Sequence, residues 1–404
     1  MTLTSIACTS FSGVANTMEI FHSQGKIERA PSPETCIQWE MKMGLYKLSR
    51  PKAAADDWIW LFDHFVSKGG YKCLAVMGVR MTTLLERGDL TLCCEDLEPL
   101  GIVPMKKSNG ELMQAELENI LAINHGIPPL AIIKDQGSDV RCGGRVFSEA
   151  HPGVIDIDDI PHRIARLYEH LLSTDESWKN FTTVSANFKK QVQLTEYAVL
   201  APPNQRAKAR YHNIDILVDW ATKQLLSFEE LSSAMKTKLK WLKECQDELK
   251  YWQQLVEIGR IGRHFVRTEG LWLDCYESLE DHLLTVNMDE RAKEFTCDLV
   301  DIFKEAGNKI PSGKKIIGST ESIESLFGKY KGVVARGPQP MGRLILSMAS
   351  RVGERPTELL VQSAFEEIKE RDVSEWLQQA FNPTTPKPLK TFNGINMESP
   401  TLVA

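Results

Sequence analysis

The sequence predicts an α/β protein whose central sheet domain is interrupted by a helical insertion. Between residues 53 and 172, short aliphatic and aromatic runs alternate with segments of helical periodicity, which is typical of a sheet flanked by helices. Between residues 173 and 312, helical periodicity continues without a convincing strand. With 404 residues, of which 42% are hydrophobic and 25% charged, the chain is long enough for two or three domains with a sizeable core.

Residues 1–52 are predicted to form a small helical domain of the helix-turn-helix type. One helix is expected at 13–23. Ser32 is a good N-cap for a second helix, Pro33 suits its first position, and Gly44 is expected to end it. Such a domain would bind DNA. The alternative is a helical subdomain that contacts no DNA.

Basic residues follow this second helix, and Arg50 and Lys52 are therefore candidate DNA-binding residues. The chain as a whole is acidic, with a formal net charge of −6, but positive charge gathers locally. The segment 304–351 contains nine Lys and Arg against three Asp and Glu. Such a surface can still bind a polyanion, because charge interactions are screened beyond about 10 Å.

The segment 53–172 is predicted to be the first part of the core domain, in the order three strands, helix, strand, helix, strand, helix. Its strand-like runs are short and rich in aromatic and β-branched residues. They are W-I-W-L-F-D-H-F, K-C-L-A-V-M-G-V-R, the run from L-T-L-C-C through Val103, P-L-A-I-I-K and G-V-I-D-I-D-D-I.

Most of the remaining chain is predicted to be helical. Within the insertion, Ser227 and Glu230 have the spacing of a capping box before a long helical run. The predicted regions are the helical insertion at 173–312, a helix of the core at 313–335, C-terminal helices at 336–381 and a disordered Pro/Thr-rich tail at 382–404.

The composition argues against several classes of protein. No run of 18 apolar residues is present, so we expect no membrane partner. The N-terminus lacks the basic region of a secretory signal. Nine cysteines without a C-x-x-C motif indicate neither a disulfide framework nor a zinc site. We therefore expect a reduced, cytoplasmic protein.

Two aspartates are prominent at strand positions. Asp63 lies within an apolar strand, where a carboxylate needs an ion pair, hydrogen bonds or a bound cation. Asp135 directly follows the apolar run ending in Lys134, and ligands gather at the carboxyl ends of strands in α/β sheets. Each has an alternative interpretation: Asp63 could reach water at a strand edge, and D-Q-G-S-D is also good turn and N-cap chemistry.

A third carboxylate lies in I-I-G-S-T-E-S-I-E-S-L-F-G-K-Y-K-G. The stripe of Ile323, Leu326, Phe327 and Tyr330 predicts a helix, which leaves Glu324, Gly328 and Lys331 on a neighbouring face. Gly328 costs about 1 kcal/mol relative to alanine in a helix, so it indicates a close approach to the backbone. Glu321, one turn earlier, is the alternative to Glu324. A solvated charged face is the alternative for the whole set.

Together, Asp63, Asp135 and Glu324 predict a site for two divalent ions. Such ions, about 3.5–4 Å apart, activate a water or a 3′-hydroxyl and stabilise the leaving oxygen of a phosphodiester. Oxygen-only ligands favour Mg²⁺ or Mn²⁺. Lys331 would then contact a DNA phosphate, and with Lys329 it is a candidate DNA-binding residue.

These segments resemble the DDE transposases of bacterial insertion sequences. Asp63 matches the family's first-strand aspartate, and Asp135 lies in a motif similar to the D-N-G-S of integrases. Glu324 and Lys331 keep the family's interval of six intervening residues. The resemblance implies a ribonuclease H-like catalytic core with a mixed sheet, and these three acids as its catalytic and metal-binding residues. The 188 residues between Asp135 and Glu324 match a helical insertion, which some transposase groups have.

The element from Asp159 to His162 resembles an Asp-x-x-His that several transposase superfamilies carry. These two residues and Glu321 are candidate accessory residues. The alternative for Asp159 is a capped helix start with Pro161 just inside it.

The resemblance implies a transposase that binds the ends of a mobile element, cleaves DNA with two Mg²⁺ or Mn²⁺ ions, and transfers the freed strand to target DNA. Its partner would be double-stranded DNA, on which it would assemble as a homo-oligomer near the nucleoid of a prokaryote. The alternatives are a non-catalytic DNA-binding protein derived from a transposase and a structure-selective nuclease on the same fold.

Overall fold

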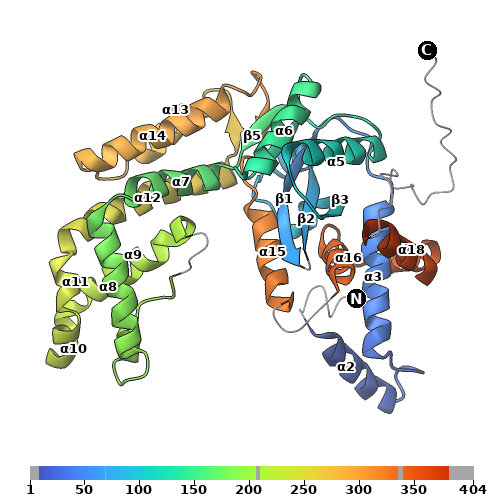
Figure 1. Ribbon diagram of the computed structural model, residues 1–404, viewed down its shortest axis with the longest axis horizontal. Coiled ribbons are helices and arrows are strands. Elements are labelled where there is room, and N and C mark those ends of the chain that lie inside the picture. Colours follow the sequence, from blue (N-terminus) through green and yellow to red (C-terminus); the bar gives the residue numbers. More distant parts are fainter. Residues whose placement is uncertain (1–8, 69, 206–209, 335–339, 382–404) are drawn as a thin grey trace. The chain divides into compact units, whose positions relative to one another are not determined.

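The computed structural model of the protein describes residues 9–68, 70–205, 210–334 and 340–381. The chain divides into two compact units, Met1–Asp156 with Thr320–Ala404, and Ile157–Ser319. The first contains most of the sheet and is named the sheet unit. The second is named the helical unit, and the boundary between them falls inside the last strand of the sheet (Figure 1).

The sheet has five strands, β1 (Trp58–Lys68), β2 (Tyr71–Arg80), β3 (Glu98–Met105), β4 (Ala131–Lys134) and β5 (Ile155–Asp158). Their spatial order is β3-β2-β1-β4-β5. β2 pairs antiparallel with β1 and β3, whereas β1 pairs parallel with β4. The predicted α/β class is therefore confirmed. The L-T-L-C-C run is not part of β3, because a 3₁₀ turn at Cys94–Asp96 intervenes.

Four helices accompany these strands, α4 (Met81–Arg87), α5 (Gly110–Ile123), α6 (Ser138–Ala150) and α15 (Glu321–Val334). Alternate β1 residues Trp60 and Phe62 pack into a core with α5 and α6, where Trp60 stacks on Phe147 at 5.6 Å between ring centroids. α15 packs against the opposite face of β1. There the ring centroids of Phe327 of α15 and Phe65 of β1 are 5.3 Å apart. The strand pleat thus divides β1 between two helical layers.

The N-terminal helices belong to the sheet unit and pack with the C-terminal ones. They are α2 (Phe11–Ser23) and α3 (Pro33–Ser49), with α16 (Met341–Arg351), α17 (Glu358–Glu367) and α18 (Glu370–Phe381) at the other end. Ser32 caps α3 as predicted, since its hydroxyl accepts the amide of Thr35 at 3.2 Å.

Gly44 does not end α3, so that prediction was wrong. The helix continues to Ser49. A Cβ atom added at Gly44 would lie 1.8 Å from the carbonyl oxygen of Leu346 in α16. The two helices therefore cross in backbone contact at this position, and glycine is needed for the close approach rather than for a stop.

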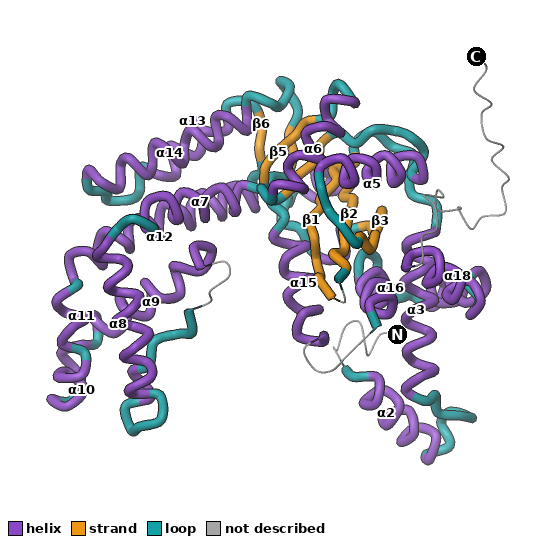
Figure 2. Tube along the Cα trace, viewed as in Figure 1, coloured by secondary structure: helices purple, strands orange, loops and turns teal. Residues whose placement is uncertain are grey.

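The helical unit is almost entirely helical (Figure 2). Its helices are α7 (Ile160–Leu172), α8 (Glu176–Val192), α9 (Ile214–Leu226), α10 (Ser233–Lys238), α11 (Lys240–Glu244), α12 (Gln246–Thr268), α13 (Cys275–Leu283) and α14 (Glu290–Gly307). Its one pair of short strands is β6 (Leu271–Trp272) with β7 (Lys315–Ile316), within the described residues. The predicted insertion 173–312 falls wholly inside this unit.

The predicted capping box at Ser227 is not formed. Its hydroxyl donates backwards to the carbonyl of Lys223 at 3.0 Å, at the end of α9, and the following residues form a short 3₁₀ turn, Phe228–Glu230. The expected long helix is instead divided into α10, α11 and α12, with breaks at Leu239 and Cys245. Aromatic side chains form the core between α8 and α12. The ring centroids of Trp178 of α8 and Trp252 of α12 are 5.0 Å apart.

In the described ranges, no helix combines the length and the apolar character needed to cross a membrane. The predicted disordered tail at 382–404 lies outside these ranges.

Candidate functional site

Asp63 and Asp135 occupy adjacent positions on neighbouring parallel strands. The pairing of β1 with β4 ends with Phe62 opposite Lys134. One residue further along both strands are Asp63, still inside β1, and Asp135, directly after β4. Neighbouring strands lie about 4.8 Å apart. Both residues are half-buried, and their backbones occupy neighbouring positions at this edge.

The strand pleat directs these carboxylates away from α6. Phe62 and Lys134 both point toward α6, because a Cβ added at Gly144 of that helix would lie 2.5 Å from Lys134 Cδ and 3.1 Å from Phe62 Cζ. The next residue on β1, Asp63, lies on the opposite face, which is the face that α15 approaches. Asp135 is the first residue after β4, and alternation would start it toward the same side.

α15 has the buried stripe that the sequence predicted. Ile323, Leu326 and Phe327 are each less than 5% exposed. The fourth predicted member, Tyr330, has a side chain outside the described set. So do Glu324, Lys329 and Lys331, although their backbone belongs to α15. The contribution of these side chains to the site therefore stays a prediction.

Gly328 lies on an open part of α15. A Cβ added there would meet no atom within 4 Å outside the neighbouring helix backbone, and the residue is exposed. Packing of the described protein therefore does not require glycine at this position. This leaves room beside the helix for the close approach that the sequence predicted. Glu321, the alternative ligand, is the half-buried first residue of α15.

The donor chemistry of Asp63 and Asp135 fits a hard divalent cation, since both supply carboxylate oxygens, one from within β1 and one from the residue after β4. Among the side chains that the structure describes, no group of three or more His, Cys, Asp or Glu is placed to hold a metal ion. The third predicted ligand, Glu324, is not among those side chains.

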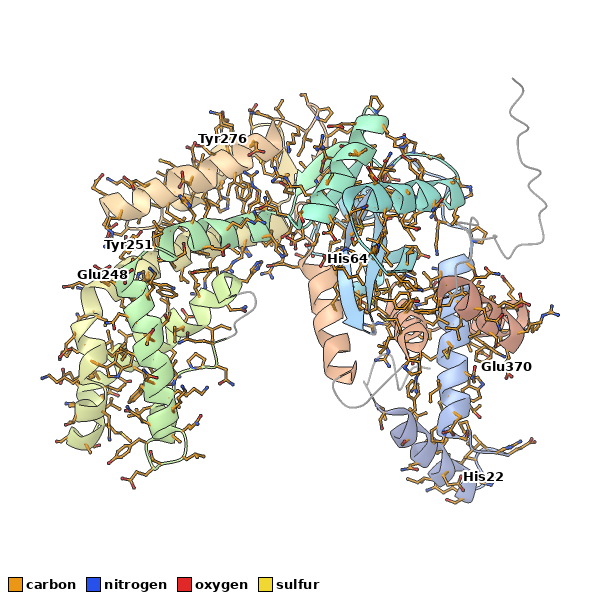
Figure 3. The ribbon with its side chains drawn as sticks, in the orientation of Figure 1. His22, His64, Glu248, Tyr251, Tyr276 and Glu370 are labelled. Atoms are coloured by element: carbon orange, nitrogen blue, oxygen red, sulfur yellow. The ribbon has the colours of Figure 1, made fainter. Side chains whose placement is uncertain are left out.

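A polar cluster that the sequence did not predict lies on the α6 side of the same strands. Its members are His64 of β1 (labelled in Figure 3), Ser108 before α5, and Asp139 in the first turn of α6. The Ser108 hydroxyl donates to Asp139 Oδ2 at 2.6 Å, and His64 Nε2 lies 3.1 Å from the same oxygen. Nε2 is also 3.0 Å from Ser108 Oγ. Lys72 Nζ approaches Asp139 Oδ2 at 3.4 Å.

Burial would raise the pKa of Asp139, but the hydrogen bond from Ser108 and the adjacent His64 imidazole outweigh it and hold that pKa well below 3.8. Asp139 is therefore an anion in the folded protein. The only sequence signal for it was its place in D-Q-G-S-D, where capping was the alternative interpretation. α6 in fact begins after Gly137 without a side-chain cap.

Lys134 forms a second ion pair on the α6 side of the sheet. Its ammonium group contacts Asp156 Oδ1 of β5, and its side chain is only 2% exposed. Ser148 of α6 donates to the other oxygen of Asp156 at 3.5 Å. The lysine that immediately precedes Asp135 is thus held inside the sheet unit.

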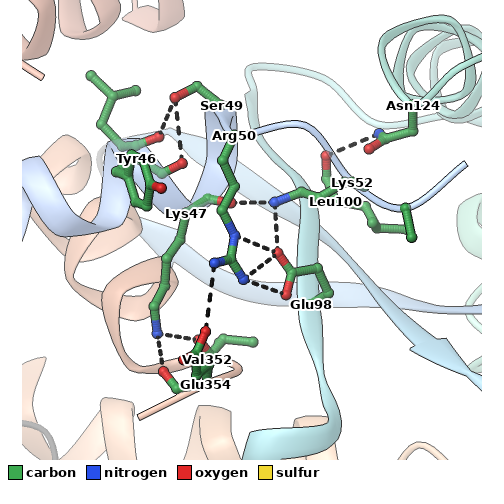
Figure 4. A network of polar contacts seen from close by, with 12 residues as sticks. Tyr46, Lys47, Ser49, Arg50, Lys52, Glu98, Leu100, Asn124, Val352 and Glu354 are labelled. Atoms are coloured by element: carbon green, nitrogen blue, oxygen red, sulfur yellow. Dashed lines mark hydrogen bonds and ion pairs between the residues drawn. The ribbon is translucent and has the colours of Figure 1, made fainter. Parts of the chain in front are cut away.

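Arg50 and Lys52 lie in an internal network rather than on an open basic surface (Figure 4). Arg50 forms a bidentate pair with Glu98 of β3, with contacts of 2.9 and 3.0 Å. Lys52 donates to Glu98 Oε1 at 2.9 Å, and its side chain is 2% exposed. Burial lowers the pKa of Lys52 to about 8, against the opposing effect of Glu98. The prediction of Lys52 as a DNA contact requires an exposure that this side chain does not have.

Lys47 extends this network to the segment after α16. Its ammonium group donates to the carbonyls of Val352 at 2.7 Å and Glu354 at 2.8 Å (Figure 4). Burial lowers the pKa of Lys47 to about 8. Lys47 in the last turn of α3 and the basic residues Arg50 and Lys52 after it therefore join α3 to β3 and to the segment after α16.

Asp159 and His162 belong to the helical unit, where they form a helix cap. Asp159 is fully buried. Its Oδ2 accepts a hydrogen bond from the backbone amide of His162 at 2.8 Å and lies 2.6 Å from His162 Nδ1. Pro161 is in the first turn of α7. The capping interpretation is confirmed, and the accessory role stays a prediction. The His162 ring also packs edge-on against the His212 ring, with 4.4 Å between the ring centroids.

Neither the protein-family models nor the curated protein sequences contain a match to this chain. The functional assignment therefore rests on its motifs and on the geometry of its own residues. That geometry places two carboxylates side by side, beside a helix that carries a third in its sequence.

Proposed function

We propose that the protein is a DDE-type DNA transposase with a ribonuclease H-like core. The observation that carries the proposal is the adjacency of Asp63 and Asp135 on parallel strands, on the face that α15 approaches. Glu324 lies in α15 and is proposed as the third ligand. A plain structural role for the two aspartates would not require like charges next to each other.

The topology supports the ribonuclease H-like assignment. The order β3-β2-β1-β4-β5 places the first and fourth strands side by side, and these strands carry the two aspartates. The helical unit, Ile157–Ser319, lies in the chain between Asp135 and α15, as a helical insertion in such a core would. The long sequence interval between the second and third acids is thereby explained.

The chemistry needs divalent ions between the carboxylates. When bound there, two Mg²⁺ or Mn²⁺ ions supply charge neutralisation and activate the attacking oxygen. Asp63 provides a donor fixed within β1, Asp135 provides one directly after β4, and Glu324 is proposed to provide one from α15. Lys331 lies seven positions after Glu324, about two turns along the same helix face, and is proposed to bind a DNA phosphate.

Two in-line displacements follow in this proposal. A water oxygen first forms a bond to the scissile phosphorus, and the bond to the 3′-oxygen breaks. The freed 3′-hydroxyl then attacks a phosphorus of target DNA and displaces the target's own 3′-oxygen, without a covalent enzyme intermediate. Positioning and charge neutralisation by the protein account for most of the rate.

The test is cleavage of DNA that carries the genomic flanks of the gene encoding this chain. We expect nicking in Mg²⁺ or Mn²⁺ and none in EDTA. Asp63→Asn, Asp135→Asn and Glu324→Gln should each lower the rate by roughly 10³-fold, because a bound ion supplies several kcal/mol and each 1.36 kcal/mol is tenfold. Glu149→Gln, an exposed change on α6, is the matched control and should cleave normally.

Normal cleavage by a folded variant would remove that residue from the ligand set. Loss of activity in Glu321→Gln, with a working Glu324→Gln, would move the third ligand back by one turn. Specific DNA binding without any metal-dependent cleavage would instead support a non-catalytic DNA-binding protein.

A further inference from the structure

The cluster of His64, Ser108 and Asp139 joins the same two chain segments as the two proposed metal ligands, but from the other side of the sheet. His64 directly follows Asp63 on β1, and Asp139 lies four residues after Asp135. Ser108 comes from the segment between β3 and α5. Three separate segments therefore meet at Asp139 Oδ2, which lies 2.6 Å from Ser108 Oγ and 3.1 Å from His64 Nε2.

The position of Asp135 needs such support. The β1–β4 register ends with Phe62 and Lys134, so Asp135 begins the short segment that leads to α6 at Ser138. Asp63 and Asp135 can hold a cation together only while they stay at neighbouring positions, and the repulsion between two carboxylates opposes that closeness. A contact that fixes the first turn of α6 against β1 limits how far Asp135 can move from Asp63.

The three side chains are not arranged as a Ser-His-Asp nucleophile. In such a triad the imidazole bridges the other two residues through different nitrogens, and the serine proton is directed to the imidazole. Here a single nitrogen, His64 Nε2, lies near both Ser108 and Asp139, and the serine hydroxyl donates to the carboxylate. The geometry favours a mechanical role.

We propose that His64, Ser108 and Asp139 form a clasp that positions Asp63 and Asp135 for metal binding on the opposite face of the sheet, an inference that rests on the proposed function of those two aspartates. The clasp residues do not touch the reacting DNA. They act through the two strands, as partners outside the ligand shell do in other metal sites.

The experiment measures Mn²⁺ binding to the full-length protein by calorimetry, together with the Mn²⁺ concentration that gives half-maximal DNA nicking. In Asp139→Asn both should weaken by about 10- to 100-fold, the range for residues that orient ligands. The nicking rate at saturating Mn²⁺ should stay within a few-fold of that of the wild type. Ser108→Ala removes one donor from a loop, should fold, and should shift both values in the same direction by less.

Glu149→Gln on α6 is the control and should leave both values unchanged. Unchanged Mn²⁺ affinity in folded Asp139→Asn and Ser108→Ala would overturn the clasp while the transposase proposal stands. Mn²⁺ binding that requires Asp63 and weakens in Asp139→Asn, without any DNA cleavage, would support the clasp and overturn the transposase. If Asp63→Asn does not reduce Mn²⁺ binding by the protein, both proposals fail.

Discussion

The two faces of the sheet at β1 and β4 differ in the charges that they bring together. On the α6 face, charges of opposite sign are paired: Lys134 contacts Asp156, and the anion of Asp139 lies beside His64. On the α15 face, Asp63 and Asp135 bring two like charges to adjacent strand positions. The pleat separates the two environments by a single residue along each strand.

This difference accords with the proposed chemistry on the α15 face and with a stabilising role for the α6 face. Paired charges with hydrogen bonds maintain the fold, and their disruption leaves a buried charge without its partner. Two carboxylates at neighbouring positions repel each other, and a bound cation would relieve that repulsion; such local conflicts are typical of functional sites. Variants on the two faces should therefore change stability in opposite directions.

The largest effect is expected on the α6 face, in Asp156→Asn. This change removes the charged partner of Lys134, whose side chain is 2% exposed, and should lower the free energy of unfolding by about 3 kcal/mol. Urea denaturation measures it. The double variant Lys134→Met/Asp156→Leu removes both charges and should recover most of that loss. Wild-type stability in Asp156→Asn would remove the contrast between the faces.

A second expectation concerns acid. The folded-state pKa of Asp139 lies below its ordinary value of 3.8, because the hydrogen bond from Ser108 and the adjacent His64 outweigh the opposing effect of burial. Its stabilisation is therefore present above pH 3.8 and is lost as the pH falls through the folded-state pKa. In Asp139→Asn, the acid dependence of the unfolding free energy should become shallower by up to about 1.4 kcal/mol per pH unit.

Denaturation of both proteins between pH 2 and pH 6 gives the two slopes. Equal slopes would mean that Asp139 titrates alike in the folded and unfolded states, contrary to the hydrogen-bonded geometry of the cluster.

A change of opposite sign is expected on the α15 face. In EDTA, Asp63→Asn or Asp135→Asn should raise the free energy of unfolding by about 1 kcal/mol, since neighbouring like charges repel and solvent and salt weaken the repulsion. The gain should shrink at high salt. A loss as large as that of Asp156→Asn would show that the carboxylates stabilise the fold, and the contrast between the faces would then be wrong.

The smallest effect is expected at the solvent side of α6. Arg145 and Glu149 form an exposed pair four residues apart, with both side chains about 60% exposed and 2.7 Å between them. Arg145→Ala should change the unfolding free energy by less than about 0.5 kcal/mol. A larger change would indicate that α6 as a whole is sensitive to charge, and the effect of Asp156→Asn could not then be assigned to its buried pair alone.

Much of the secondary structure follows from local sequence signals. The order of the strands, the Ser32 cap and the buried stripe of α15 were predictable, because side-chain periodicity and capping act over a few residues. The short helix α4 between β2 and β3 was not predicted. The adjacency of Asp63 and Asp135 was expected from a resemblance in motif order. Its geometric basis, the parallel register of β1 with β4, required the fold.

The roles of several individual residues were decided only by tertiary packing. Gly44 had the local signature of a helix end, but the crossing of α3 with α16 uses it for backbone contact. Arg50 and Lys52 had the sequence pattern of a basic surface. In the structure both side chains instead form ion pairs with Glu98, which is more than 40 residues away in the chain. The partner of Asp139 was likewise beyond local reach, since His64 lies 75 residues earlier.

The sequence by itself therefore determined which elements form and in what order, together with the acidic residues available for chemistry. The tertiary structure decided which charges are neutralised inside the protein and which are brought together at one edge of the sheet. The physical reason is that propensity and capping depend on neighbours in the chain. The environment of a charge depends instead on burial and on partners that only the folded chain brings within a few ångströms.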